Sequence, residues 1–415
     1  MTGSGKSAVR TVGRRPGLRL DTTGERTRPG RLIDDRDWRT MTARASRELR
    51  NRVCRSASIR PTQHEPLNLR AGDWVQVKSA KEILATLDQE GRVESLPFMP
   101  EMLQYCDRTF QVVKRADKTC DTIESTGLRR MHNAVHLADV RCDGRQHDGC
   151  QAGCLLFWKE AWLRRPDAGK SPRVRTVAAG SNGLLDAGSD PPGCPSMPLR
   201  SVMTATRSSN VAGELTYMCQ ATELRAATSA LPWWYVSQYV RDVRSGNATV
   251  AQVLRGALIG LFNRTQVLLR RVVPASVLVR DGLKYPFIQG VLTRTPTEVI
   301  GLQPGDVVEI KSKEEIVATL DTNNRNRGLL FDREEVRFCG RRARVLRRVN
   351  KVIDERTGKM IHIDSDSVIL EGVYCGGEFN RCCPRGIYSF WREIWLKKAG
   401  EPCHGPSQPH GTEHA

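Results

Sequence analysis

The sequence lacks the features of an exported or membrane-spanning protein. Its first thirty residues are polar and rich in glycine and arginine, without the apolar segment of a secretory signal. No stretch reaches the roughly eighteen apolar residues that a membrane-spanning helix needs. We therefore predict a cytoplasmic protein of bacterial type. In such a reducing compartment, cysteines bind metal or stay free more often than they form disulfide bonds.

The sequence also lacks the common catalytic motifs. No paired-carboxylate, Ser-His-Asp, dinucleotide-binding or metalloprotease pattern occurs in it. The pair in HNAVH, His132 and His136, has the spacing of a two-histidine metal helix, but the expected glutamate is missing. Whether the protein is an enzyme therefore stays open.

Positive charge is the strongest feature of the composition. The formal net charge is +19 and the isoelectric point is near 9.7, which indicates a polyanionic partner, either nucleic acid or an anionic membrane surface. About half of the excess lies in residues 1–60, so much of it belongs to a flexible tail.

An internal repeat organises the chain. LRAGDWVQVKSAKEILATLD (residues 69–88) matches LQPGDVVEIKSKEEIVATLD (residues 302–321) at a constant offset. The same offset aligns FWKEAWL with FWREIWL. It also pairs three cysteines of each copy: Cys106 with Cys339, Cys142 with Cys375, and Cys150 with Cys383. A register held over some ninety residues indicates two copies of one domain.

Each copy has the same predicted order of elements. A Gly-Asp turn opens an alternating strand, a short helix follows, and a second, basic strand comes next. This order resembles the small SH3-like barrels, including those of the KOW type, and the duplication resembles bacterial sequences. The resemblance implies an α+β fold of two homologous modules. Each would be a small SH3-like β-barrel with a cysteine-bearing loop and a tryptophan-rich helix, on which Trp158 and Trp162 share one face.

Composition divides the chain into six segments. These are a basic, disordered tail (1–66), a first module (67–165), a flexible linker (166–211), a helical middle segment (212–275), a second module (276–400) and a disordered tail (401–415). In the middle segment, TVAQVLRGALIGLFNRTQVLLRR has a broad apolar face beside arginines. It is either a core helix that docks the two modules or an interfacial helix on anionic lipid.

The cysteines retained in both copies indicate a shared physical demand, and metal binding is one candidate. Zn²⁺ takes thiolate and imidazole ligands in a tetrahedral arrangement. The candidate ligands are Cys106, Cys120, Cys142, His147, Cys150 and Cys154 in the first copy, and Cys339, Cys375 and Cys383 in the second. No Cys-x2-Cys knuckle is among them, so ordinary buried thiols stay an alternative. Four thiolates of the first copy are also enough for an iron–sulfur cluster.

The leading functional hypothesis is a metal-stabilised binding protein that contacts nucleic acid through the basic strand of each module. The predicted phosphate-binding residues are Lys114, Arg115, Lys118, Arg347, Arg348 and Lys351. Glu160 and Glu393 are expected to form ion pairs with these strands. The alternatives are an enzyme with a metal or iron–sulfur centre in the first module, and a membrane-surface scaffold protein. Protein partners are a further possibility.

Overall fold

The computed structural model of the protein describes residues 65–124, 126–166, 202–203, 206–209 and 213–399. All of them fall within the larger of the chain's two units, Thr62–Ala415. The greater part of the predicted tails and linker lies outside the described residues. Their predicted disorder therefore stays a prediction.

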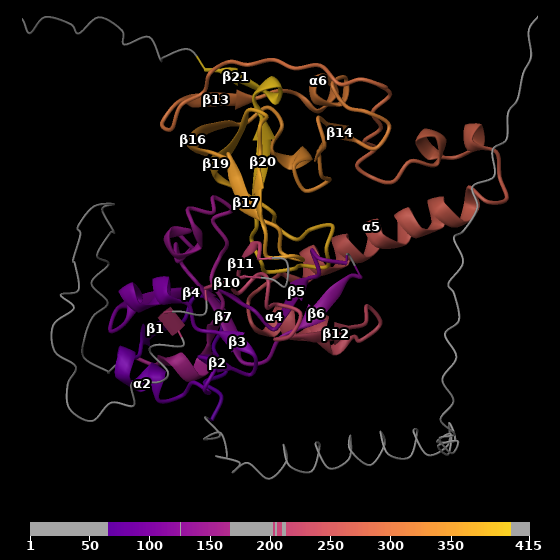
Figure 1. Ribbon diagram of the computed structural model, residues 1–415. Coiled ribbons are helices and arrows are strands. Elements are labelled where there is room, and N and C mark those ends of the chain that lie inside the picture. Colours follow the sequence, from indigo (N-terminus) through magenta and orange to yellow (C-terminus); the bar gives the residue numbers. More distant parts are fainter. Residues whose placement is uncertain (1–64, 125, 167–201, 204–205, 210–212, 400–415) are drawn as a thin grey trace, which may run out of the picture. The chain divides into compact units, whose positions relative to one another are not determined.

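The first copy is built on a five-stranded antiparallel sheet (Figure 1). Its strands follow the order β8 (Trp158–Lys159), β7 (Ala134–Leu137), β4 (Thr109–Arg115), β1 (Trp74–Val77) and β9 (Leu163–Arg164). Val75 and Val77 of β1 are fully buried, as the alternating pattern predicts. The short helix α2 (Ala80–Leu84) begins at a capping box formed by Ser79 and Glu82.

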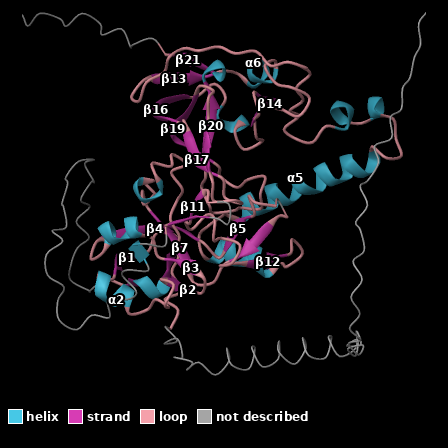
Figure 2. Ribbon diagram, in the orientation of Figure 1, coloured by secondary structure: helices cyan, strands magenta, loops and turns pink. Residues whose placement is uncertain are grey.

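The second copy has a five-stranded sheet with the corresponding strands in the same order. They are β20 (Tyr388–Arg392), β19 (Ser367–Tyr374), β16 (Arg342–Arg348), β13 (Val307–Ile310) and β21 (Leu396–Lys398), with helix α6 (Lys313–Val317) after β13. The pairing register also corresponds, because Trp74 faces Gln111 in the first sheet and Val307 faces Arg344 in the second. The described part of the chain has an α+β fold with antiparallel sheets (Figure 2).

Smaller elements complete the two copies and the middle segment. The strands are β2 (Arg92–Val93), β3 (Leu96–Pro97), β5 (Lys118–Cys120), β6 (Leu128–Arg130), β10 (Arg207–Ser209), β11 (Leu215–Tyr217), β12 (Ser229–Leu231), β14 (Arg325–Asn326), β15 (Leu329–Leu330), β17 (Lys351–Ile353) and β18 (Met360–His362). The 3-10 helices are η1 (Pro100–Tyr105), η2 (Arg145–His147), η3 (Glu160–Trp162), η4 (Ala275–Val277), η5 (Val279–Gly282), η6 (Val336–Phe338) and η7 (Glu393–Trp395). The middle segment is only partly helical, since β12 pairs with β6 before α4 (Ser237–Arg244) and α5 (Val250–Leu269) begin.

The tryptophan motif forms a strand, a 3-10 turn and a second strand, so the predicted helix is wrong. Trp158 belongs to β8 and pairs with Val135 of β7, which commits its backbone to the sheet. The turn η3 then carries Trp162 back over the same core. Both indoles are fully buried and meet Phe98 edge-on, at centroid distances of 6.3 and 5.2 Å. Trp391, Trp395 and Phe331 repeat this cluster in the second copy.

The predicted pairing of Glu160 and Glu393 with the basic strands is confirmed. Arg115 Nη1 lies 2.7 Å from Glu160 Oε1, and Arg348 Nη1 lies 2.6 Å from Glu393 Oε1. Each glutamate also accepts backbone N–H groups from the segment before the first strand, including that of Leu69 in the first copy. The buried carboxylate therefore fastens that segment to the sheet.

Helix α5 turns most of its leucines outward, while Phe262 packs edge-on against Phe287. Thr249 and Gln252 form a capping box at its start. Its buried side chains are the polar Asn263 and Gln266, which bond Tyr285 and the Val279 carbonyl. The leucines are exposed, so the predicted role of a core helix that docks the two modules is wrong. None of the described helices combines the length and the apolar composition needed to cross a bilayer.

A reciprocal contact joins the two copies. The Ile353 N–H donates to Cys150 Sγ at 3.4 Å, and the Cys120 N–H donates to Cys383 Sγ at 3.2 Å. Ile353 and Cys120 end the corresponding strands β17 and β5, and the two acceptor cysteines also correspond in the repeat. Such exchange of equivalent contacts is the rule at a two-fold interface between identical subunits. It gives the retained Cys150 and Cys383 a structural role that needs no metal.

Candidate metal centre

Three side chains with metal-ligating atoms meet in the first copy. Glu101 comes from η1, Cys142 follows β7, and His147 ends η2. Cys142 Sγ lies 3.3 Å from Glu101 Oε1 and 3.9 Å from His147 Nδ1, and Nδ1 lies 3.9 Å from the same carboxylate oxygen. Within the part of the chain that the structure describes, this is the group of three such residues whose ligand atoms all lie within 4.8 Å of one another.

The turn that carries His147 depends on Gly144. This glycine has a φ of 74°, and a Cβ there would lie 1.9 Å from the Cys150 carbonyl oxygen. Only glycine fits this approach, so it sets the path from Cys142 to His147. The His147 N–H then closes the turn on the Gly144 carbonyl at 2.9 Å.

The imidazole of His147 is oriented by its second nitrogen. Nε2 lies 3.2 Å from the Met218 carbonyl oxygen, which only accepts a hydrogen bond. Nε2 therefore carries the proton, and Nδ1 presents its lone pair to Cys142 and Glu101. A backbone carbonyl that fixes the tautomer in this way is the usual outer partner of a metal-binding histidine.

Burial makes the metal-free site electrostatically unfavourable for anions. Glu101 is 6% exposed, and its Oε2 atom has no hydrogen-bond partner. Burial raises the pKa of the Glu101 carboxyl, and burial together with the nearby carboxylate raises the pKa of the Cys142 thiol. A divalent cation reverses this preference, because it stabilises the thiolate and the carboxylate together.

The three ligand atoms fit a tetrahedral zinc ion. Zinc bonds of about 2.0–2.3 Å place neighbouring ligand atoms roughly 3.3–3.6 Å apart in a tetrahedron. The Sγ–Oε1 separation of 3.3 Å already lies within this range, and the two separations from Nδ1, both 3.9 Å, have to shorten by about 0.3–0.6 Å. The Glu101–Cys142–His147 group can therefore hold a metal ion, and its mixed oxygen, sulfur and nitrogen donors suit zinc.

A cavity of about 40 Å³ adjoins the group and supplies candidates for the fourth ligand. Three further cysteines line it: Cys150, Cys154 and Cys219. Burial raises the pKa of Cys154 to about 12 and that of Cys219 to about 11, so both are neutral thiols when no metal is bound. The remaining lining is largely apolar and includes Leu156, Phe157 and Ile353.

The structure distributes the predicted metal ligands over several places. Cys142 and His147 belong to the group, and Cys150 and Cys154 line the cavity. Cys106 packs at the edge of the first core, whereas Cys120 lies against Cys383 and does not line the cavity.

His136 belongs to β7 and not to a helix, and its Nδ1 bonds the Leu156 carbonyl inside the core. The ten described cysteines are free thiols.

The second copy lacks the third ligand. Glu334 and Cys375 stand where the first copy has Glu101 and Cys142, but Asn380 takes the position of His147. Glu334 Oε1 accepts the Phe379 N–H at 2.6 Å, and its Oε2 is unpartnered, as in the first copy. Cys339 packs at the edge of the second core.

Sequence reasoning missed Glu101 and Cys219. The repeat contained a signal for the first, because Glu101 and Glu334 occupy equivalent positions, just as the paired cysteines do. Nothing in the sequence marks Cys219, which belongs to the middle segment and reaches the cavity only through the tertiary fold.

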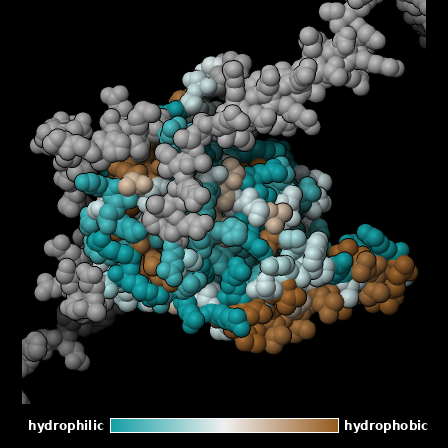
Figure 3. All heavy atoms as spheres, turned by 90° about the horizontal axis from the view of Figure 1, so that it is seen from below, coloured by the Kyte–Doolittle hydropathy of each residue, from teal (hydrophilic) through white to brown (hydrophobic). Residues whose placement is uncertain are grey.

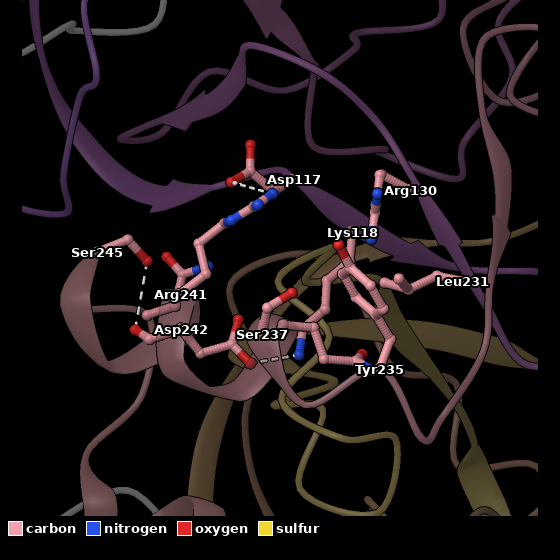
Figure 4. Close-up of a pocket in the computed structure, with 11 residues that line it drawn as sticks. Asp117, Lys118, Arg130, Leu231, Tyr235, Ser237, Arg241, Asp242 and Ser245 are labelled. Carbon is pink, nitrogen blue, oxygen red and sulfur yellow. Dashed lines mark hydrogen bonds and ion pairs between the residues drawn. The ribbon is translucent and has the colours of Figure 1, made fainter.

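The basic strand of the first copy is occupied by structural contacts. Arg115 is held by Glu160 and by Asp117, whose Oδ2 lies 2.8 Å from Arg115 Nε. Lys118 is 2% exposed and contacts the Asp242 carboxylate (Figure 4). It also contacts the Arg381 carbonyl oxygen. Lys114 contacts the Asn247 carbonyl oxygen. The predicted phosphate contacts of Arg115 and Lys118 do not fit this burial.

In the second copy the predicted cations are more accessible. Arg348 is bound by Glu393 and Asp366. Arg347 and Lys351 are half-buried and make no ion pair with any described residue. The backbone of Lys351 bonds Gln151, so this strand end takes part in the contact between the copies.

Comparison with known proteins gives no relative for this chain: no family model, no curated protein and no solved structure matches it.

Proposed function

We propose that this protein is a metal-stabilised binding protein, with Zn²⁺ held by Glu101, Cys142 and His147. The observation that carries the proposal is the convergence of three buried ligand atoms, with the His147 tautomer set by the Met218 carbonyl. A cysteine of the cavity completes the tetrahedron. A closed four-ligand site of this kind is structural, because catalytic zinc keeps an open position.

The proposed role of the ion is to join segments that are distant in the chain. Glu101 and His147 belong to separate 3-10 helices of the first copy, and Met218 belongs to the middle segment. Metal binding would fix all three, and its free energy would add to that of folding. In this proposal the two copies are homologous SH3-like modules, which the shared order and register of their sheets support.

Metal analysis of the full-length protein tests the proposal. Purified protein is expected to contain one zinc per chain and to show no visible absorption. Cys142→Ala and His147→Asn should lose the ion. Cys375→Ala is the matched control, since it removes the equivalent thiol from the copy without the histidine, and it should keep the ion.

Two results would overturn the zinc centre. One is wild-type protein that stays free of metal after purification with added zinc. The other is full zinc content in the Cys142→Ala variant. Visible absorption with bound iron would instead support the iron–sulfur enzyme.

A second candidate function is nucleic-acid binding by the second copy, and the outer face of β16 favours it. Arg342 and Arg344 are exposed there, and their ion pairs with Glu309 and Glu371 are long, at 3.7 and 4.0 Å. Such exposed pairs contribute little and exchange readily for phosphate contacts. The first copy has Thr109 and Gln111 at these positions.

Binding to mixed RNA and DNA at low salt tests this candidate. Replacing Arg342 and Arg344 by glutamate should weaken binding and flatten its salt dependence. Arg356→Glu changes an exposed arginine outside β16 and is the control. If the double variant binds as well as wild type, β16 is not the contact surface.

A further inference from the structure

An apolar stripe runs along the exposed face of α5 and is interrupted at Thr265. Its members recur at intervals of three, four or seven residues, which places them on one side of the helix. They are Val250, Leu254, Leu258, Leu261 and Leu268, with exposed fractions of 58, 59, 66, 61 and 51%. A helix of 20 residues is about 30 Å long, so the stripe exposes much more apolar surface than a single leucine would. Figure 3 shows hydrophobic residues gathered along this helix.

The inward face explains why the stripe points outward. Asn263 Oδ1 accepts the Tyr285 N–H at 2.7 Å, and Gln266 Nε2 donates to the Val279 carbonyl at 2.7 Å. These buried amides fix the rotation of the helix about its axis, because turning the leucines inward would leave both amides and their partners unsatisfied. The exposure of the stripe is therefore built into the fold.

Most of the charge beside the stripe is positive. Arg255 pairs with Glu378 at 2.9 Å, whereas Arg264 and Arg271 form no ion pair with any described residue. Residues 243–280 contain six arginines and no aspartate or glutamate. Arg264 and Arg271 occupy positions flanking the stripe on α5 and just beyond its end. Long arginine side chains beside an apolar face reach polar head groups while their stems cover apolar surface. A basic helix with an apolar stripe matches an anionic lipid surface, whereas an uncharged apolar partner would leave the arginines without counter-charge.

Aromatic side chains extend the apolar surface next to α5. The Arg264 guanidinium lies 5.3 Å from the ring centre of Trp233, which connects the loop before α4 to the helix. Trp233 and Trp234 are exposed, and their rings meet edge-on at 5.8 Å. Tryptophan favours the boundary between water and lipid, because its ring is apolar and its N–H is polar.

We propose that α5 and the adjoining Trp233–Trp234 pair form a docking surface for an anionic lipid membrane. The stripe lies in the plane of the head groups, its leucines enter the acyl boundary, and the flanking arginines contact lipid phosphates. This inference does not depend on the metal centre, which lies in the first copy.

Vesicle flotation with the full-length protein tests the proposal. The wild type is expected to float with vesicles of phosphatidylcholine and phosphatidylserine and much less with phosphatidylcholine alone. Leu258→Ser with Leu261→Ser should lower the partition coefficient by roughly tenfold or more, since two exposed leucines no longer enter lipid. Arg264→Glu with Arg271→Glu should remove the preference for phosphatidylserine. Val291→Ser with Val299→Ser changes exposed valines elsewhere and should have no effect.

Three outcomes overturn the proposal. If the leucine variant floats as well as the wild type, binding comes from elsewhere in the chain, such as the arginines of residues 1–60. If the wild type binds neither kind of vesicle, α5 has no affinity for lipid. If α5 instead mediates a dimer that the leucine variant converts to monomer, without vesicle binding, a second copy of the chain covers the stripe.

Discussion

Each of the two copies has a five-stranded sheet with the same strand order, but the two sheets differ in one of the loops that connect their strands. The strand orders correspond, and so do the tryptophan clusters and the buried glutamate–arginine pairs. The loops between β7 and β8 and between β19 and β20 differ at one decisive position, where His147 stands opposite Asn380. The comparison separates residues that both sheets have in common from residues that occur in one copy alone.

The buried glutamates test whether the copies are stabilised in the same way. Glu160→Gln and Glu393→Gln should each cost about 3 kcal/mol, the lower end for breaking a buried ion pair, because the arginine keeps its second carboxylate partner, Asp117 or Asp366. The loss should be larger in the first copy, since the Arg115 side chain is 10% exposed and that of Arg348 is 25% exposed. Chemical denaturation followed by tryptophan fluorescence measures the effect. A loss below about 1 kcal/mol in both variants would contradict the shared role of the pair.

His136 makes the first copy sensitive to acid. It is fully buried, and burial lowers its pKa from 6.5 to about 4. The unfolded chain therefore binds a proton below pH 6.5 that the folded chain does not bind until about pH 4. Stability should fall over this window by about 3 kcal/mol as pH decreases.

The second copy supplies the matched variant for this test. Ile369, which is buried in β19, takes the position of His136. His136→Ile should remove that part of the pH dependence when both proteins are unfolded in the presence of a chelator. An unchanged slope between pH 6.5 and 4 would show that other groups cause the acid sensitivity.

The Asn380→His substitution tests whether a histidine at this position is enough to create a zinc site in the second copy. The Asn380 N–H bonds the Gly377 carbonyl as that of His147 bonds Gly144, so the new imidazole would start from an equivalent turn. It would join Glu334 and Cys375, and zinc content should rise from one to two per chain. At free zinc of a hundred times Kd, the added ion should stabilise the protein by about 2.7 kcal/mol.

Asn380→Gln is the control for this gain, because it enlarges the side chain without adding an imidazole. Zinc content that stays at one in Asn380→His would mean that the imidazole is not enough, and that the Met218 carbonyl or a cavity cysteine of the first copy is also required.

The reciprocal thiol contacts should have the smallest effects. Cys150→Ala and Cys383→Ala each remove the acceptor of one backbone N–H from the other copy. We expect a loss of about 1 kcal/mol in each, and most of it should be recovered by serine at the same position. Thermal unfolding compares the four variants. A much larger loss in Cys150→Ala alone would identify Cys150 as the fourth zinc ligand.

Sequence periodicity predicted some elements better than others. The alternation in β1 and β13 and the pairing of Glu160 and Glu393 with basic strands were predicted from residue patterns. The helix predicted for FWKEAWL was wrong, because a four-residue spacing of tryptophans fits both a helix and a strand followed by a 3-10 turn. The apolar pattern of α5 was also recognised, but a pattern shows only that one face is apolar and not which way it points.

The sequence by itself predicted the duplication and determined the two alternating strands and the anchoring tryptophans, because these depend on local spacing and on residue type. Tertiary structure alone decided that Glu101 meets Cys142 and His147, that Arg115 and Lys118 are buried, and that α5 exposes its leucines. Each of these rests on a contact between distant segments: Glu101 with Cys142, Lys118 with Asp242, and Asn263 with Tyr285. Such contacts depend on how the elements pack, and no local pattern records that packing.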